Sequence, residues 1–369
     1  MKITSHPRQQ LQSEWISAIR EHAPAAEKDG KLQPEQLAVV YDQQWFKMLV
    51  PAAYGGLELS LPDELRLIEA IAWADGSMGW AITLCTGAGW FGGFLDPDLS
   101  RDVFADPQVC LAGSGAPGGE ATIVPGGYLV DGSWKYASGA LHATHFTANC
   151  IICDDNGPVL NAEGEKTIKA FLFKKDEVNV LPAWNYVGMV ATGSHSFEVK
   201  NVQVPANRAF IIDANFAVLK KPLYTYPFRQ LAEGTLAINL SGLAIHFIDL
   251  CKPIFIKRGE AKGFIKSQQD KLDEVYSRSV FRLNDARDEF YRAADRSWAC
   301  FINNDTDILD DSLKAVSQTS RRLARVARQA VDDLYPYCGL IAASTSSEIS
   351  RVWRDLHTAS QHSLLTFES

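Results

Sequence analysis

The change of hydrophobic periodicity along the chain constrains its fold more than any single motif does. Residues 1 to about 110 carry helical patterns, one of which begins at Pro62-Asp63. From about 111 to 212 the helical pattern is replaced by short β-rich runs, which are separated by Pro-Gly-Gly, Asp-Asn-Gly and Leu-Pro breaks. Beyond about residue 228 the helical period returns. The chain is therefore predicted to be an α+β protein, with a small antiparallel β-barrel or sandwich between two helical regions.

Two long apolar stripes run through the last third of the chain. Their members recur at helical spacing, as on the inner face of helices that pack together. The first stripe contains Leu272, Val275, Tyr276, Val280, Leu283, Phe290 and Ala294, and the second contains Leu313, Val316, Leu323, Ala327, Ala330 and Leu334. These stripes offer more apolar surface than the bundle of one chain needs, which indicates self-association. The three regions are predicted to divide into domains at 1–110, 111–212 and 213–369.

The balance of charges narrows the kinds of partner. The chain has 44 acidic and 36 basic residues and a formal net charge of −8, whereas a protein that neutralises phosphates needs a positive excess. No nucleic-acid partner is therefore expected. The polar start MKITSHPRQQLQSEW and the lack of an apolar run of about 20 residues predict no membrane segment. The seven cysteines have no framework spacing, so reduced thiols and a cytoplasmic location are expected.

Three short motifs match known patterns without the context that those patterns need. The run from Gly113 to Gly118 satisfies G-x-G-x-x-G, but it contains Pro117 and precedes strand-like residues, where a dinucleotide-binding fold has a helix. Cys150 and Cys153 are spaced as C-x-x-C, yet an extended strand sends them to opposite faces. The pair in His142-Ala-Thr-His145 lacks a further ligand at suitable spacing. The sequence therefore predicts no metal site.

Four segments carry a resemblance that periodicity cannot supply. They read, in chain order, LVPAAYGGLELSLPDELRLIEAIA, GSGAPGGEATIVPGGYLVDGSWKYASG, GMVATGSHSFEVKNVQVP and VWRDLHTASQH. Together they resemble the successive signatures of the acyl-CoA dehydrogenase superfamily over nearly the whole chain. The resemblance implies an N-terminal helical domain, a central β domain and a C-terminal four-helix bundle. It further implies a flavin, either FAD or FMN, between the β domain and the bundle, and a homotetramer.

The resemblance also assigns cofactor contacts. Ser138 ends the strand-like SWKYAS run, where the superfamily places a hydroxyl that hydrogen-bonds flavin N5; a simple turn residue before Gly139 is the alternative. The other residues that the resemblance places at the flavin are Ser114, Gly115, Ala116, Trp134, Gly139, Thr192, Ser194 and Arg258. Turn-forming roles for the glycines and hydroxyls, and a solvent-exposed position for the arginine, are the alternatives.

The residue that acts as base separates the branches of the superfamily. Acyl-CoA dehydrogenation needs a carboxylate to remove an α-proton, and the common members keep a Glu shortly after the Arg-Asp pair of the final helix. Here Arg354-Asp355 is followed by no acid as far as Ser363. His362 instead resembles the histidine of the flavin-dependent monooxygenases, which together with a serine hydrogen-bonds the oxygen adduct of the flavin. A packed or surface histidine is the alternative.

Two features leave other functions open. The segment AITLCTGAGWFGG lacks the second histidine that the monooxygenase branch often carries there. Glu233 lies close to where a minority of acyl-CoA dehydrogenases keep their base, although an acid at a helix N-terminus is the alternative. The leading hypothesis is a monooxygenase that receives reduced flavin from a flavin reductase and acts on a small aromatic or apolar substrate. The others are an acyl-CoA dehydrogenase that uses Glu233 and an electron-transfer flavoprotein, and a non-catalytic scaffold of the same fold.

Overall fold

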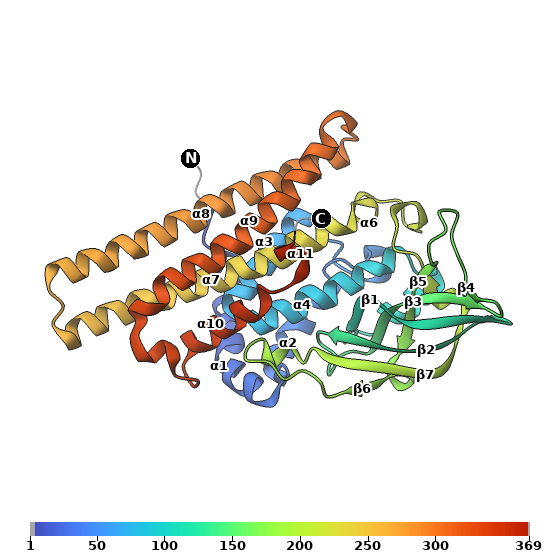
Figure 1. The fold of residues 1–369 in the computed structure, drawn as a ribbon, viewed down its shortest axis with the longest axis horizontal. Helices are drawn as coiled ribbons and strands as arrows, with labels where there is room; N and C mark the ends of the chain where they lie inside the picture. Colours follow the sequence, from blue (N-terminus) through green and yellow to red (C-terminus); the bar gives the residue numbers. More distant parts are fainter. Residues whose placement is uncertain (1–3, 368–369) are drawn as a thin grey trace.

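The computed structural model describes residues 4–367 and places helices before and after a central sheet (Figure 1). The main helices of the N-terminal region are α1 (Ser13–Asp29), α2 (Pro34–Asp42), α3 (Leu61–Ala74), α4 (Gly76–Gly89) and α5 (Pro97–Phe104). Asp75 ends α3 and caps α4, because its side chain accepts a hydrogen bond from the Met78 N–H at 2.8 Å. The helix α4 then folds back so closely that a Cβ at Gly79 would lie 2.5 Å from the Ala72 Cα.

The central region forms one mixed sheet. Its strands are β1 (Leu111–Val124), β2 (Gly127–Ala137), β3 (His145–Asp154), β4 (Gly157–Pro158), β5 (Ile168–Lys174), β6 (Asn179–Leu181), β7 (His195–Pro205) and β8 (Ala209–Phe210). The order across the sheet is β6-β7-β2-β1-β3-β5-β8, and β4 pairs with β3. A second hydrophobic cluster, which includes Trp134, Phe146 and Phe197, fills the curve of this sheet.

The predicted antiparallel barrel or sandwich is wrong in two respects. First, β1 and β3 pair in parallel, because β3 returns antiparallel to β2 but on the far side of β1. Second, β6 and β8 end the strand order in the described part of the chain, and the sheet does not close on itself. The parallel ladder changes register between Ser114 and Pro117 and again between Pro117 and Gly119, which is a bulge in β1.

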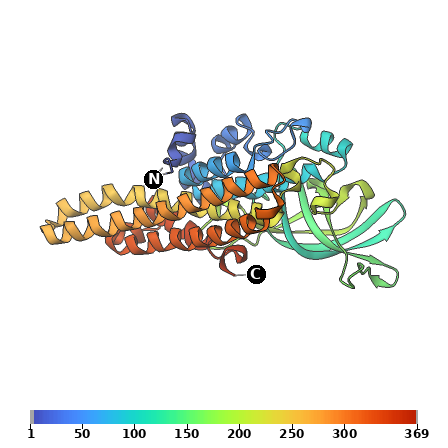
Figure 2. The same ribbon diagram turned by 90° about the horizontal axis from the view of Figure 1, so that it is seen from above.

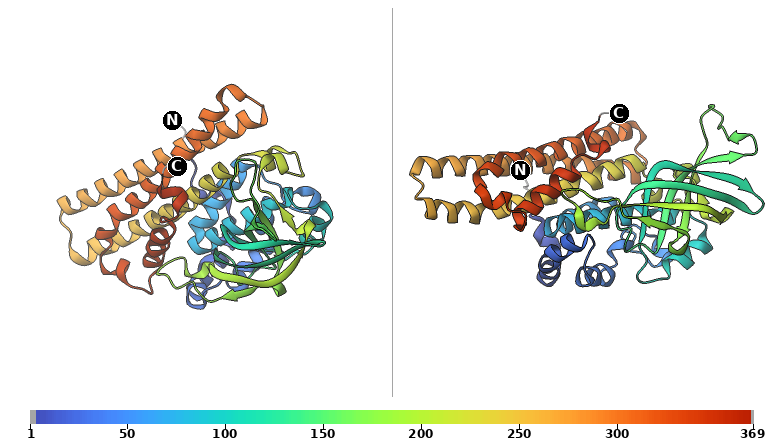
Figure 3. Two further views of the ribbon diagram at one scale, coloured as in Figure 1. Left: turned by 45° about the vertical axis from the view of Figure 1, so that its right-hand side comes forward. Right: turned by 60° about the horizontal axis from the view of Figure 1, so that its bottom comes forward.

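The C-terminal region consists of α6 (Pro222–Thr225), α7 (Phe228–Lys262), α8 (Lys266–Ile302), α9 (Thr306–Cys338), α10 (Glu348–Ala359) and α11 (Ser363–Thr366). The three long helices α7, α8 and α9 lie side by side and project away from the β region (Figures 1 and 2). The expected four-helix bundle is not confirmed in detail: three of the helices are long, and the short α10 packs on α7. The N-terminal helices α3 and α4 also pack on α7, so one hydrophobic core joins both helical regions (Figure 3). The domain bounds at 110 and 212 stay a prediction.

The helix α7 is long and apolar enough to cross a membrane by length and composition, with a mean hydropathy of 1.4 in its most apolar window. However, 89% of that window is buried inside the protein. Because α3, α4, α9 and α10 all contact α7, its apolar faces are covered by other parts of the same chain. This burial is that of a core helix.

A buried ion pair links α3 to α8. Arg287 donates from Nε to Glu69 Oε1 and from Nη2 to Glu69 Oε2, both at 2.8 Å. The Tyr291 hydroxyl donates to the same carboxylate at 2.8 Å, and Ser241 of α7 donates to Oε1. The side chains of Arg287 and Glu69 are only 2% and 3% exposed. Four polar groups from three helices therefore depend on one another in the core.

Candidate active site between the sheet and the helices

Two adjoining cavities lie where the sheet meets the helices. The first, which we call the apolar cavity, measures about 440 Å³ and is bordered by α4, α7, β1 and β3. The second, which we call the aromatic cavity, measures about 480 Å³ and is bordered by the end of β2, the segment 184–194 and the ends of α10 and α11. The residues that line both are Leu84, Gly113, Ser114, Gly115 and His362. Volumes of this size suit a cofactor and a small ligand side by side.

His362 is the ionisable side chain that lines both cavities. It caps α11, because its Nδ1 accepts a hydrogen bond from the Leu364 N–H at 3.3 Å. Burial lowers the pKa of His362, so the imidazole is neutral near pH 7. Since Nδ1 is an acceptor, we infer that the proton of the neutral ring is on Nε2. That nitrogen makes no hydrogen bond to a described residue, so it is a free donor at the boundary of the two cavities.

Ser138 and Ser194 line the aromatic cavity, as the sequence predicts for flavin contacts. Their hydroxyl oxygens lie 2.8 Å apart, and Ser194 Oγ lies 2.7 Å from the Thr192 hydroxyl behind it. Thr192 is 1% exposed and lines neither cavity. Its hydroxyl contacts Ser194 from the side away from the cavity. The Gly139 N–H donates to the Thr192 carbonyl at 2.8 Å, which ties the end of β2 to this segment.

An aromatic group that sequence reasoning missed forms one wall of the aromatic cavity. Tyr136, Trp184 and Tyr186 lie together, with the Trp184 and Tyr186 ring centroids 4.4 Å apart and the two tyrosine hydroxyls 3.1 Å apart. The tyrosines remain 49% and 46% exposed, so they leave aromatic surface available to a planar ligand. The Ala183-Trp-Asn-Tyr186 run carries a sequence signal for this wall, namely two aromatic residues just after the Leu-Pro break.

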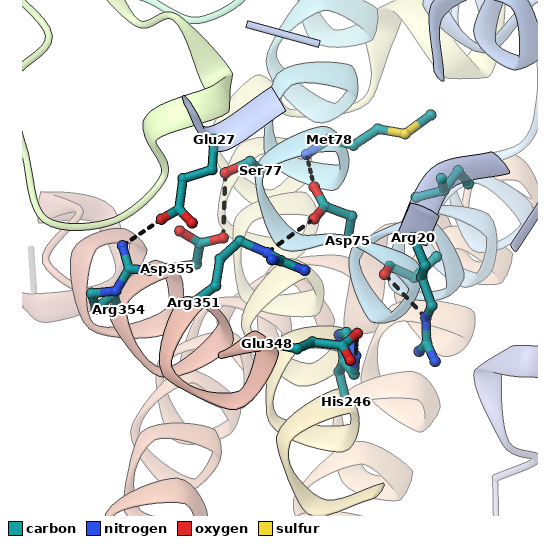
Figure 4. A network of polar contacts seen from close by, with 12 residues as sticks. Arg20, Glu27, Asp75, Ser77, Met78, His246, Glu348, Arg351, Arg354 and Asp355 are labelled. Atoms are coloured by element: carbon teal, nitrogen blue, oxygen red, sulfur yellow. Dashed lines mark hydrogen bonds and ion pairs between the residues drawn. The ribbon is translucent and has the colours of Figure 1, made fainter. Parts of the chain in front are cut away.

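The segment that carries this wall is held against α10. Met189 donates its N–H to the Asp355 carboxylate. The Ser77 hydroxyl donates to the same carboxylate at 3.3 Å, as Figure 4 shows. Arg354 donates to the Val187 carbonyl at 2.7 Å. Between these contacts the two backbones meet so closely that a Cβ at Gly188 would lie 2.1 Å from the Arg354 carbonyl oxygen. The helix α10 therefore fixes the position of the cavity wall.

Burial raises the pKa of Asp355 to about 7, and the nearby Asp75 carboxylate adds to the effect. The folded protein then holds a proton that the unfolded chain has released, so the free energy of unfolding falls as pH rises from about 4 to about 7. Asp355→Asn keeps an acceptor for the Met189 N–H and removes this titration. Denaturant unfolding is measured between pH 4.5 and 7.5. In Asp355→Asn the free energy of unfolding should fall less steeply with rising pH than in the wild type, by up to about 1.4 kcal/mol per pH unit.

The matched control for Asp355→Asn is Asp273→Asn, because Asp273 is exposed on α8. Its pH slope should equal that of the wild type. An unchanged slope in Asp355→Asn would mean that Asp355 does not hold its proton in the folded protein.

The remaining predicted cofactor residues divide into two groups. Ser114 and Gly115 line both cavities, which agrees with a role at the flavin. Ala116 is exposed, and Trp134 is buried in the sheet, where its Nε1 donates to the Asn149 carbonyl at 2.9 Å. Arg258 lies in the distal half of α7 and bonds the Tyr337 carbonyl. Neither cavity of this chain is lined by Ala116, Trp134, Gly139 or Arg258.

The structure also contradicts the assignment of Glu233 as a base. Its side chain is fully buried, and Oε1 accepts hydrogen bonds from Arg229 and Arg321, each at 3.1 Å. The neighbouring residues Ala232 and Thr235 line the apolar cavity, whereas Glu233 does not. A fully buried carboxylate that lies outside the cavity lining, with Oε1 paired to two guanidinium groups, is not placed to take a proton from a ligand there. Among the described residues, no cluster of His, Cys, Asp or Glu is suited to a metal ion.

Comparisons with known proteins agree with this architecture. Residues 8–92 match the model for the acyl-CoA dehydrogenase N-terminal domain, and residues 275–367 match the model for the acyl-CoA dehydrogenase C-terminal domain. The oxygenase subunit HsaA of a flavin-dependent monooxygenase from Mycobacterium tuberculosis is 26% identical, over 94% of this chain and 89% of that protein.

Two solved structures share the fold. The 3-HSA hydroxylase from Rhodococcus sp. RHA1 has a TM-score of 0.87 at 22% identity and covers 99% of this chain and 94% of its own. XiaF from a Streptomyces species, in complex with FADH2 and glycerol, has a TM-score of 0.79 at 21% identity and covers 97% of this chain and 93% of its own.

Proposed function

The chain belongs to the acyl-CoA dehydrogenase superfamily, and we propose that it is the oxygenase component of a two-component flavin-dependent monooxygenase. The observation that carries the proposal is the chemistry of the cavity boundary. A neutral imidazole, that of His362, lines both cavities, and neither lining contains Asp or Glu. Dehydrogenation of an acyl-CoA needs a carboxylate base at this place. A hydrogen-bond donor without a base fits oxygen chemistry instead.

The aromatic cavity fits a flavin, and FAD and FMN both remain candidates. Its lining combines a planar aromatic wall with the Ser138 hydroxyl and the unobstructed backbone of Gly115, where a Cβ would meet no atom within 4 Å. An isoalloxazine ring needs such flat apolar surface together with a few hydrogen bonds at its polar edge. Reduced flavin supplies the electrons that activate oxygen. The XiaF complex with FADH2 supports this cofactor by analogy.

The residues of this chain have distinct parts in the reaction. His362 offers its Nε2–H between cofactor and substrate, where negative charge develops on oxygen. Trp80 packs against the His362 ring, with 6.0 Å between ring centroids, and shields one side of it. The segment 184–194 and the end of α10 form one side of the aromatic cavity. With a flavin bound in the aromatic cavity, the Ser138 hydroxyl would be a hydrogen-bond partner for its edge.

The apolar cavity supports a small, uncharged aromatic or apolar substrate. Its lining includes Leu84, Phe91, Phe228, Leu231 and Leu236, and it contains no Lys, Arg, Asp or Glu. A carboxylate group in this cavity would lose its hydration without gaining a positive partner. Two polar groups there are free: the Thr147 hydroxyl makes no hydrogen bond to a described residue, and Asn149 uses only Nδ2, toward the Gly115 carbonyl at 2.8 Å. One hydroxyl or N–H on the substrate can pair with them.

The proposal is tested by mixing the protein anaerobically with reduced FMN or FAD, adding oxygen, and measuring hydroxylated product and hydrogen peroxide. Neutral and anionic aromatic pairs, such as phenol with 4-hydroxyphenylacetate and indole with indole-3-acetate, serve as substrates. The neutral member should give the larger ratio of product to peroxide, by about tenfold or more, since an unpaired charge costs more than 1.4 kcal/mol on burial.

The alternatives give different results in the same assay. Bleaching of bound oxidised flavin by an acyl-CoA would indicate a dehydrogenase. Failure to bind flavin in either redox state would indicate a scaffold. Product from the anionic members alone would contradict the substrate class but not the reaction.

A flavin reductase is the protein partner that this function requires. We further propose a cytoplasmic homotetramer. Exposed apolar side chains on and beside the long helices support self-association: Ile265 is 64%, Phe281 69% and Leu340 89% exposed.

A further inference from the structure

Three buried hydroxyl groups form a chain that ends at the aromatic cavity. Ser138 Oγ lies 2.8 Å from Ser194 Oγ, which lies 2.7 Å from Thr192 Oγ1, which lies 2.6 Å from the Met189 carbonyl oxygen. The three side chains are between 1% and 4% exposed, so bulk water does not offer them other partners. Of the three, Ser138 and Ser194 line the cavity.

The carbonyl at the inner end fixes the direction of every hydrogen bond in this chain. A carbonyl oxygen only accepts, and two oxygens 2.6 Å apart repel unless a proton lies between them, so Thr192 donates to Met189. Thr192 has then used its one proton, and Ser194 must donate to Thr192. Ser194 has then used its proton as well, and Ser138 must donate to Ser194. The Ser138 oxygen is left with lone pairs and no proton for the cavity.

The inner end of the chain is itself held in place. The Met189 carbonyl also accepts the Trp184 indole N–H at 2.8 Å, and the Met189 N–H is bonded to Asp355. The carbonyl therefore cannot turn away to release the Thr192 proton. The direction of the chain is a property of the folded segment, and it does not depend on what occupies the cavity.

We propose that Thr192 and Ser194 are positioning residues that keep the Ser138 hydroxyl a pure hydrogen-bond acceptor toward the flavin. The inference rests on the proposed function, because it concerns the flavin that this function requires. N5 of a reduced flavin carries a hydrogen and donates, whereas N5 of an oxidised flavin is an acceptor. The Ser138 oxygen therefore accepts a hydrogen bond from N5 of the reduced flavin. With the oxidised flavin, the Ser138 oxygen and N5 are both acceptors, and they repel each other. The chain thereby favours the form that a reductase delivers.

The test measures dissociation constants of reduced flavin, anaerobically, and of oxidised flavin for the wild type and Ser194→Ala. Removing the Ser194 hydroxyl frees the Ser138 proton to point at the cavity. Oxidised flavin should then bind more tightly, and the ratio of the oxidised to the reduced dissociation constant should fall about tenfold, the value of one hydrogen bond. The midpoint potential of the bound flavin should fall by about 30 mV in parallel. A gain of binding is not expected from a variant that merely loosens the structure.

Two variants control the experiment. Ser194→Thr keeps the hydroxyl and should keep the wild-type ratio. Ser196→Ala removes a buried serine hydroxyl of β7 that has no hydrogen-bond partner and lines neither cavity, and it should also keep the ratio. A wild-type ratio in Ser194→Ala, with flavin bound in both forms, would overturn the positioning role alone. Failure of the wild type to bind either form would overturn the proposed function and this inference together.

Discussion

Replacing His362 by alanine should lower the yield of hydroxylated product per reduced flavin about 100-fold, the usual effect of removing one donor that stabilises developing negative charge. Hydrogen peroxide should rise to account for the lost product. The affinity for reduced flavin should change little, because the aromatic wall and Ser138 are intact. Product and peroxide are measured in a single turnover with a neutral aromatic substrate.

The position of the His362 proton allows a second variant to test the same prediction. Since Nδ1 accepts from the Leu364 N–H, the active donor is inferred to be Nε2–H. Glutamine extends an amide N–H to about the reach of Nε2, so His362→Gln should recover part of the product that alanine loses. His357→Ala is the control, because His357 lies nearby on α10, bonds Asp332 and lines neither cavity. If His362→Ala gave as much product per reduced flavin as the wild type, His362 would have no part in the reaction.

Arg287→Ala should lower the free energy of unfolding by about 3–5 kcal/mol, the cost of leaving one member of a buried ion pair without its partner. Glu69 would keep its hydrogen bonds from Tyr291 and Ser241 but lose the guanidinium that neutralises it. The midpoint of denaturant unfolding reports the change.

Two further variants separate the ion pair from the general effect of losing an arginine. Arg282→Ala removes an exposed arginine from the same helix, whose contact with Asp333 is 3.6 Å long, and should cost less than about 1 kcal/mol. The double variant Glu69→Leu, Arg287→Met should be more stable than Arg287→Ala, because no buried charge is left unpaired. If Arg287→Ala were as stable as Arg282→Ala, the buried ion pair would make no measurable contribution to the free energy of unfolding.

Local patterns predicted the parts of this molecule that local forces determine. The order of helices, sheet and helices is confirmed, because periodicity and chain breaks act within one element. The parallel pairing of β1 with β3 was missed, since the side of β1 on which a later strand lands depends on contacts far along the chain. Helical spacing alone did not reveal that Glu233 faces Arg321 instead of a cavity.

The candidate site divides in the same way. Ser138 and His362 belong to quoted motifs and line the aromatic cavity, and their contacts with a flavin stay predictions. Trp184 and Tyr186 were not predicted, because they belong to a loop whose position is set by Asp355, more than 160 residues later in the sequence. The aromatic residues of such a loop can be read from the sequence, but its position cannot, because contacts with a distant helix set it.

Gly113 and Gly115, which line both cavities, differ in whether they can be replaced by a larger residue. A Cβ at Gly113 would lie 2.1 Å from the Thr147 hydroxyl oxygen, so that position can accept no side chain without displacing a strand. A Cβ at Gly115 would meet nothing within 4 Å, and its backbone does not need glycine. A single-nucleotide change can turn a glycine codon into one for alanine or valine. Position 115 can therefore gain a side chain beside both cavities without first acquiring a stabilising mutation elsewhere, so any selection for glycine there comes from the cofactor and not from the fold.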